Sequence, residues 1–209
     1  MIYNEIFPLD VKLSNEEINQ LETLDCGIPF HVVETHKDLV AAVAELSECH
    51  LLGFDTEKRP AFRRGESYPP AMVQLSSAKA IFIFRLKGHL PKELTTLFSN
   101  PDIIKAGVAV GRDISELRTM QRFVPANFVD LGVCSEQNGL HHHGLKGLVA
   151  LLLARRLSKG AKLTNWERTD IPLNALKYAA LDAWAGRLIY QAMKHRGCRM
   201  NPFVIAQNS

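Results

Sequence analysis

Two carboxylates, Asp55 and Glu57, stand two positions apart in the segment LLGFDTEKRP, residues 51–60. The segment begins with apolar residues, which indicates a buried β-strand, and residues i and i+2 of a strand project from the same face. Two like charges side by side are costly unless a cation lies between them or one of them is protonated. A hard divalent cation such as Mg²⁺ or Mn²⁺ is a natural partner for clustered carboxylates. The alternative, a strand end whose charges are simply solvated, stays open at this point.

A third carboxylate, Asp113, follows the apolar run IIKAGVAV, residues 103–110, which is typical of a strand buried on both faces. Asp113 stands where this predicted strand gives way to a predicted helix. Active-site groups often gather at such points in α/β sheets. Aspartate is also a preferred N-cap residue, so a capping role competes with a functional one.

Tyr178 and Asp182 lie four positions apart in a segment with the pattern of a long helix, so they share one face of it. Taken singly, the tyrosine could lie at the edge of the core and the aspartate could face solvent. Together with Asp55, Glu57 and Asp113 they could converge above one edge of a sheet. That arrangement would bring four carboxylates and a phenol together.

The elements that would position these residues alternate between strands and helices, and the last third of the chain is helical. Strands are predicted at 28–35, 51–57, within a hairpin over 71–86, at 103–110 and at 127–133, and helices at 36–48, 92–100, 113–121, 144–157 and 172–196. Thr169 and Asp170 are predicted to supply capping side chains before the last helix. This order predicts an α/β fold with a mixed central sheet flanked by helices and a helical C-terminal part.

The N-terminal residues 1–27 are predicted to form a helical appendage on the main domain. Ser14 and Glu17 have the spacing of a capping box ahead of a short apolar-periodic run. The main domain is predicted over residues 28–198, followed by a C-terminal tail over 199–209.

The motifs around these residues resemble those of 3′–5′ exonucleases of the ribonuclease H-like superfamily that are named for Asp-Glu-Asp-Asp carboxylates. GFDTE carries Asp55 and Glu57, IIKAGVAVGRDISEL carries Asp113, and LKYAALDAWAG carries Tyr178 and Asp182 in the tyrosine form of the third motif. The stretch LSKGAKLTNWERTDIPLNALKYAALDA is especially similar to the ribonuclease D and Werner-syndrome exonuclease branch. The resemblance extends from about residue 28 to 196 and implies a ribonuclease H-like sheet.

The resemblance also implies a metal-dependent 3′–5′ exonuclease that uses two divalent ions, Mg²⁺ or Mn²⁺, and releases nucleoside 5′-monophosphates. Asp55 would bridge the ions, Glu57 and Asp182 would complete the nucleophile-side ion, and Asp113 would serve the second ion partly through water. Tyr178 would hold the attacking water. An unperturbed phenol has a pKa near 10, so Tyr178 is expected to stay protonated at neutral pH.

Basic residues near the motifs are candidate substrate contacts. Arg59, Arg63 and Arg64 follow the first motif in a loop with Phe62, and they could neutralise phosphates while the ring stacks on a base. Lys159 matches a lysine of the resembled branch. A solvated loop is the alternative for the arginines. Trp166 is expected in the core, and His141–His143 is expected to form a surface loop rather than a zinc site.

The overall composition limits which partners and which cellular compartment are expected. The net charge of +3 does not by itself indicate a nucleic-acid partner, and four dispersed cysteines indicate free thiols in a reducing compartment. No signal peptide or membrane span is predicted, so a cytoplasmic location without membrane contact is expected. The expected partner is a nucleic acid with a free 3′ end, single-stranded or frayed. The alternative functions are a nucleic-acid-binding module without significant activity on the same fold, or a scaffold protein.

Overall fold

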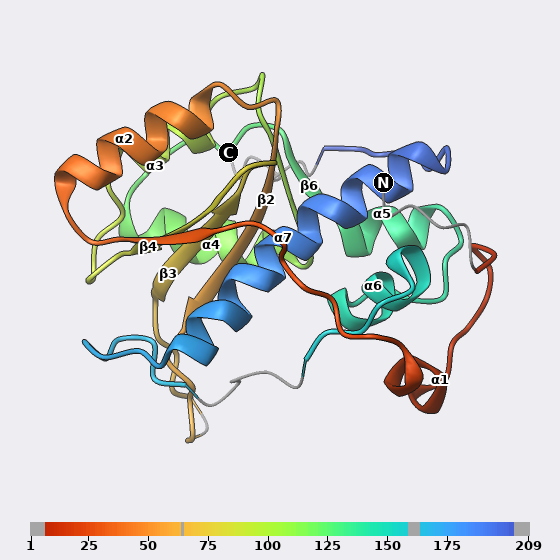
Figure 1. The fold of residues 1–209 in the computed structure, drawn as a ribbon. Helices are drawn as coiled ribbons and strands as arrows, with labels where there is room; N and C mark the ends of the chain where they lie inside the picture. The colour runs from red at the N-terminus through yellow and green to blue at the C-terminus, as the bar shows by residue number, and fades with distance from the viewer. Residues whose placement is uncertain (1–6, 64, 159–163, 203–209) are drawn as a thin grey trace.

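A mixed six-stranded sheet forms the centre of the computed structural model, which describes residues 7–63, 65–158 and 164–202 (Figure 1). The strand order is β1-β4-β3-β2-β5-β6. Only β3 runs antiparallel to its neighbours, so the other strands end at the same edge of the sheet. The strands are β1 (Phe30–Val33), β2 (Leu51–Lys58), β3 (Pro70–Ser76), β4 (Ile81–Arg85), β5 (Ile104–Gly107) and β6 (Phe128–Asp130).

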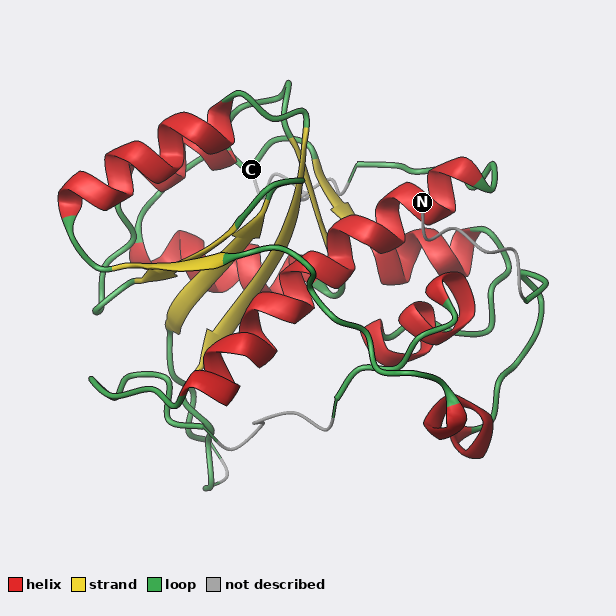
Figure 2. Cartoon of the chain, in the orientation of Figure 1, coloured by secondary structure: helices red, strands yellow, loops and turns green. Residues whose placement is uncertain are grey.

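Helices cover both faces of the sheet, as Figure 2 shows in red around the yellow strands. The helices are α1 (Asn15–Gln20), α2 (His36–Ser47), α3 (Lys92–Phe98), α4 (Val110–Met120), α5 (Leu131–Gln137), α6 (Leu145–Leu153) and α7 (Leu173–His195). One apolar cluster joins α5, α6 and α7 to one face, and a second joins α2, α3 and α4 to the other. The predicted α/β class and the helical C-terminal part are therefore confirmed.

The long helix α7 crosses the sheet above β2, where it positions the C-terminal candidate residues. Six of the fourteen buried residues of α7 are alanines, among them Ala179, Ala180 and Ala183. Small residues allow the helix axis to approach the sheet closely. Of the helices that the structure describes, none is both long enough and apolar enough to cross a membrane.

The N-terminal segment packs against α6. Ser14 and Glu17 form the predicted capping box at the start of α1, which is confirmed by both hydrogen bonds. Leu13 and Ile18 then pack against Ala150 of α6. The segment is thus held on the outside of the helical part, while the domain boundaries at residues 27 and 198 stay predictions.

Several local predictions differ from the structure. The predicted helix 144–157 is shorter, since α6 covers only Leu145–Leu153 and Ala154 is left-handed. The predicted strand 127–133 ends at Asp130, because the Asp130 side chain accepts from the backbone N–H groups of Gly132 and Val133 and begins α5 there. The predicted strand 103–110 ends at Gly107, and α4 begins at Val110.

The predicted caps of the last helix are also wrong. Helix α7 begins after Pro172 with no side-chain cap, so neither Thr169 nor Asp170 caps it. Asp170 instead pairs with Arg168 at 2.9 Å. A proline at this position fixes φ near the helical value and needs no capping side chain.

Candidate active site

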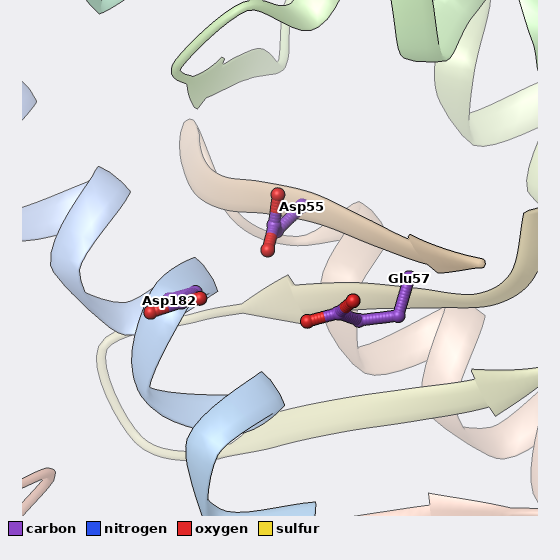
Figure 3. A group of neighbouring side chains, drawn as sticks. All are labelled: Asp55, Glu57 and Asp182. Carbon is purple, nitrogen blue, oxygen red and sulfur yellow. The ribbon is translucent and has the colours of Figure 1, made fainter. Parts of the chain in front are cut away.

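Three carboxylates from two elements meet between β2 and α7. Asp55 and Glu57 project from the same face of β2, as their spacing predicts, and Asp182 reaches them from α7 (Figure 3). One oxygen of each residue lies within 4.8 Å of one oxygen of each of the others. Clustered carboxylate oxygens at this spacing can surround one hard divalent cation.

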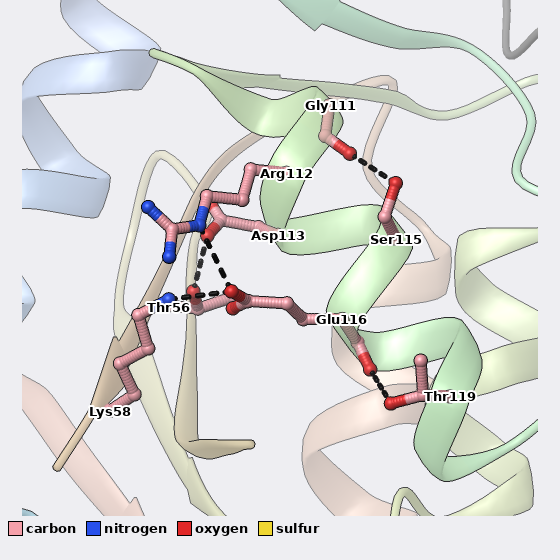
Figure 4. A network of polar contacts seen from close by, with 8 residues as sticks. All are labelled: Thr56, Lys58, Gly111, Arg112, Asp113, Ser115, Glu116 and Thr119. Atoms are coloured by element: carbon pink, nitrogen blue, oxygen red, sulfur yellow. Dashed lines mark hydrogen bonds and ion pairs between the residues drawn. The ribbon is translucent and has the colours of Figure 1, made fainter. Parts of the chain in front are cut away.

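Asp113 approaches the same region from α4. It lies in the first turn of that helix rather than at its N-cap, which is Ala109. The capping alternative is therefore wrong, and the Asp113 carboxylate instead accepts a 2.9 Å hydrogen bond from the Thr56 hydroxyl on β2 (Figure 4). Asp113 is not part of the 4.8 Å group, but its charge acts on Asp55 and Glu57.

Burial and mutual repulsion make these carboxylates hold protons more tightly than usual. Burial raises the pKa of Asp55 well above its ordinary 3.8, and the charges of Asp182, Glu57 and Asp113 raise it further. Burial, followed by the charges of Asp182 and Asp113, raises the pKa of Glu57 to about 8. Burial also raises the pKa of Asp113 to about 6, although the Thr56 hydrogen bond opposes that rise. A bound cation would relieve this repulsion and favour the ionised forms.

The Tyr178 hydroxyl is a hydrogen-bond donor at neutral pH. Burial raises its pKa above the ordinary 10, and the charge of Asp182 together with a hydrogen bond to Asp182 adds to the rise. A phenol that keeps its own proton cannot act as the general base that takes a proton from water. Its hydrogen bond to Asp182 shows that the hydroxyl can orient a neighbouring group by donation.

Trp166 is buried, as predicted, with 1% of its surface exposed. It also has a polar role that the sequence did not reveal, because a hydrogen bond from its indole N–H to Glu57 lowers the pKa of that carboxyl. Tryptophan is a donor only. A single tryptophan between the polar neighbours of TNWER gave no signal that distinguishes such a role from simple packing.

A network of ion pairs, also missed from the sequence, connects the end of β2 to α4 beside Asp113. Glu116 Oε1 lies 2.6 Å from Lys58 Nζ and 3.0 Å from Arg112 Nε (Figure 4). Glu116 lies one helical turn after Asp113, so the two carboxylates share a face of α4. That spacing is the signal that could have linked Glu116 to the site.

The structure describes two of the four basic residues that are predicted to contact substrate. Arg59 lies 3.7 Å from Glu167, and its guanidinium lies 4.6 Å from the centre of the Tyr68 ring. Arg63 is exposed, and the neighbouring Phe62 has 75% of its surface exposed. Arg64 and Lys159 lie outside the described residues. The roles of all four basic residues stay predictions.

Three further residues, Arg155, Arg156 and His142, make contacts within the chain. The Arg156 side chain donates to the Leu21 carbonyl, and Arg155 pairs with Glu22 at 3.3 Å, so both hold the N-terminal segment. His142 accepts a 2.9 Å hydrogen bond from the Leu13 backbone N–H. His142 therefore has a structural partner.

Comparison with known proteins shows to which family the chain belongs. A family model described as 3′–5′ exonuclease matches residues 30–197. The mouse "Bifunctional 3'-5' exonuclease/ATP-dependent helicase WRN" is 30% identical over 167 residues, which are 77% of this chain and 12% of that protein. Ribonuclease D of Acidiphilium cryptum is 27% identical over 170 residues, which are 79% of this chain and 42% of that protein. The chain thus spans less than half the length of these relatives.

Solved structures support the fold. The catalytic core of RRP6 from Trypanosoma brucei has a TM-score of 0.73 and 22% identity, covering 88% of this chain and 52% of that one. Escherichia coli RNase D has a TM-score of 0.69 and 17% identity, covering 80% of this chain and 46% of that one. With the six-stranded mixed sheet, these similarities confirm the predicted ribonuclease H-like architecture.

Proposed function

Because the chain belongs to the family of 3′–5′ exonucleases, we propose that it hydrolyses nucleic-acid phosphodiester bonds one at a time from a free 3′ end. The observation that carries this proposal is the meeting of Asp55, Glu57 and Asp182, whose oxygens lie within 4.8 Å of one another. Water would attack the terminal phosphorus, and the bond to the 3′ oxygen of the preceding nucleotide would break. The released product is then a nucleoside 5′-monophosphate.

The donor set fits two divalent cations, for which we propose Mg²⁺ or Mn²⁺. Asp55, Glu57 and Asp182 would hold one ion, since their oxygens already form one group. Asp55 and Asp113 would hold the other, because Asp55 is the carboxylate on which the charges of the other three all act. When bound, such ions lower the pKa of the attacking water and neutralise charge on the leaving oxygen.

The neutral residues of the site would fix the geometry of this set. Thr56 holds Asp113, and Trp166 holds Glu57, each by a hydrogen bond to the carboxylate. Tyr178 keeps its proton and bonds to Asp182, so we propose that it orients the attacking water by hydrogen bonding. It would not take the proton from that water.

The proposed substrate is a single-stranded or frayed 3′ end of DNA or RNA in the cytoplasm. Arg59 and Arg63 lie in the loop that directly follows β2, close in sequence to Glu57, and their charges would neutralise phosphates of the bound strand. One solved structure similar to this chain is a complex of Trypanosoma brucei RNase D with the RNA U12, which has a TM-score of 0.68. RNA therefore belongs in the first test beside DNA.

The test is digestion of a 5′-labelled single-stranded oligonucleotide, as DNA and as RNA, with Mg²⁺, with Mn²⁺ and with EDTA. The wild type is compared with Asp55→Ala and with Glu136→Ala, a matched loss of one exposed carboxylate on α5. We expect a metal-dependent ladder that shortens from the 3′ end with the wild type and Glu136→Ala, and none with Asp55→Ala. Retardation of the label on a gel without cleavage would refute the nuclease and favour the binding module.

A further inference from the structure

Gln74 lies directly opposite Asp55 in the antiparallel pair of β2 and β3. Residues opposite each other in such a pair project from the same face, with Cβ atoms about 4.5–5.5 Å apart. This face is the one covered by α7, since a Cβ at Gly53, two residues before Asp55 on β2, would meet the Ala183 carbonyl of that helix. The Gln74 amide therefore shares the layer in which the three carboxylates meet.

The surroundings of Gln74 are apolar except for this site. Met72 precedes it on the same face of β3, Ile83 lies opposite it on β4, and both belong to the apolar cluster beneath α7. Gln74 has 0% of its surface exposed. Within the described parts of the chain, neither Oε1 nor Nε2 of Gln74 has a hydrogen-bond partner. A buried amide without partners is costly, so its position calls for a partner that the folded protein chain alone does not provide.

The other carboxylates each have a neutral side-chain donor. The Thr56 hydroxyl donates to Asp113, the Trp166 indole to Glu57, and the Tyr178 hydroxyl bonds to Asp182. Asp55 is held instead by the backbone N–H of Thr56. Gln74 is the neutral donor that stands opposite Asp55, so it would complete the same arrangement for this carboxylate.

We propose that Gln74 is a positioning residue whose amide Nε2 donates a hydrogen bond to the Asp55 carboxylate when divalent ions occupy the site. A glutamine side chain reaches a neighbour across a strand pair by rotation about its own bonds. The amide carries no charge, so it can orient Asp55 without cancelling the negative charge that attracts cations. Hydrogen bonds of this kind to metal-binding carboxylates commonly change metal affinity or activity by about 10- to 100-fold. This inference rests on the proposed metal-dependent function.

The test compares the wild type with Gln74→Met, which conserves shape and removes both polar atoms. Without metal, the melting temperature of Gln74→Met should equal or exceed that of the wild type, because a buried group without partners is lost. Calorimetric titration with Mn²⁺ should nevertheless show about 10-fold weaker binding, and cleavage should fall by a similar factor. A residue needed only for packing would lower the melting temperature and leave Mn²⁺ binding unchanged.

The matched control is Ile83→Met, which alters packing at the position opposite Gln74 on β4 and removes no polar group. Its Mn²⁺ affinity should stay within about twofold of the wild type, since volume-conserving apolar exchanges are well tolerated. Gln74→Leu, a second apolar replacement of similar size, should bind Mn²⁺ as weakly as Gln74→Met if donation matters. Wild-type Mn²⁺ affinity in Gln74→Leu would overturn the donor assignment.

A measurement on the wild type does not depend on how the variants fold. The side-chain amide protons of Gln74 should shift and exchange more slowly with water when Mg²⁺ is added, as followed by NMR. Unchanged amide signals, or Mn²⁺ binding by Gln74→Met as tight as the wild type, would overturn the inference. If the wild type binds Mn²⁺ but cleaves neither DNA nor RNA, the proposed function fails, and the effect of Gln74 on metal binding is still decided by the titration.

Discussion

Removing the charge of Glu57 should stabilise the metal-free protein at alkaline pH. The pKa of Glu57 is raised from its ordinary 4.5 to about 8, first by burial and then by the charges of Asp182 and Asp113. The folded state therefore binds this proton more tightly than the unfolded chain does. By linkage, the free energy of unfolding falls as the pH rises from about 4.5 to about 8, and this group adds no further change above that range.

The size of the effect follows from the same values. Each pH unit between the two pKa values of 4.5 and about 8 costs about 1.4 kcal/mol, so the upper limit is about 5 kcal/mol. Glu57 is only partly buried and water can reach it, so about 2–4 kcal/mol is the expected range. In Glu57→Gln the amide oxygen can still accept from Trp166, which leaves the charge as the main difference.

The assay is urea unfolding in EDTA at intervals from pH 5 to pH 9. Glu57→Gln should match the wild type near pH 5 and exceed it by about 2–4 kcal/mol at pH 9. Glu136→Gln, which removes an exposed carboxylate on α5, should differ from the wild type by less than about 0.5 kcal/mol throughout. A difference between Glu57→Gln and the wild type that does not grow between pH 5 and pH 9 would refute the reasoning.

Three further predictions concern the neighbours of the carboxylates. Thr56→Val removes the 2.9 Å hydrogen bond to Asp113, and it should raise the Mg²⁺ concentration needed for half-maximal cleavage by about 10-fold; an unchanged Mg²⁺ midpoint would contradict this role. Tyr178→Phe should lower kcat by about 10-fold or more yet keep Mn²⁺ affinity within about threefold, as measured by calorimetry. Lys58→Met should destabilise the protein by about 1–3 kcal/mol in urea unfolding, because it removes the 2.6 Å partner of the largely buried Glu116, and Lys58→Met with Glu116→Leu should recover most of that loss.

Local spacing was sufficient to predict which candidate residues share a face. Alternation along a strand placed Asp55 beside Glu57, and the four-residue spacing placed Tyr178 beside Asp182. Both rules depend only on backbone geometry, so they hold in any fold. The meeting of these two pairs depends on where α7 lies on the sheet, which spacing does not determine. Spacing left that contact possible, the resemblance to a family implied it, and the structure brings Asp182 close to Asp55 and Glu57.

Helix starts were harder to predict, because a side-chain cap is only one way to satisfy the first turn. Helix α4 begins after Ala109, which has a left-handed φ of 59°, and α7 begins after Pro172. Neither start has a side-chain cap, so Asp113 and Asp170 bind other partners. For Asp113 this difference matters, since its carboxylate accepts from Thr56 and its charge acts on Asp55 and Glu57.

Neutral polar residues of the site gave the weakest signal in the sequence. Gln74 stands among apolar residues and the Trp166 side chain is itself largely apolar, so each is compatible with simple core packing. Their roles become visible only through strand register and hydrogen bonding, because Gln74 faces Asp55 across β2 and β3. Like charges placed together cost free energy, so their clustering in a sequence indicates a functional site. Neutral hydrogen-bond donors have no such cost, so their positions give no comparable signal.

Close packing of α7 on the sheet connects the first motif to the third. A Cβ at Gly53 would lie 1.9 Å from the Ala183 carbonyl oxygen, and one at Gly186 would lie 2.8 Å from the Ala106 carbonyl oxygen. Any larger residue at Gly53 would therefore push the helix away from β2. Asp182 neighbours Ala183 on that helix, so the same displacement would move its carboxylate out of the group with Asp55. The glycine of GFDTE is thus needed for the site as directly as the two carboxylates that follow it, although it contacts neither ion nor substrate.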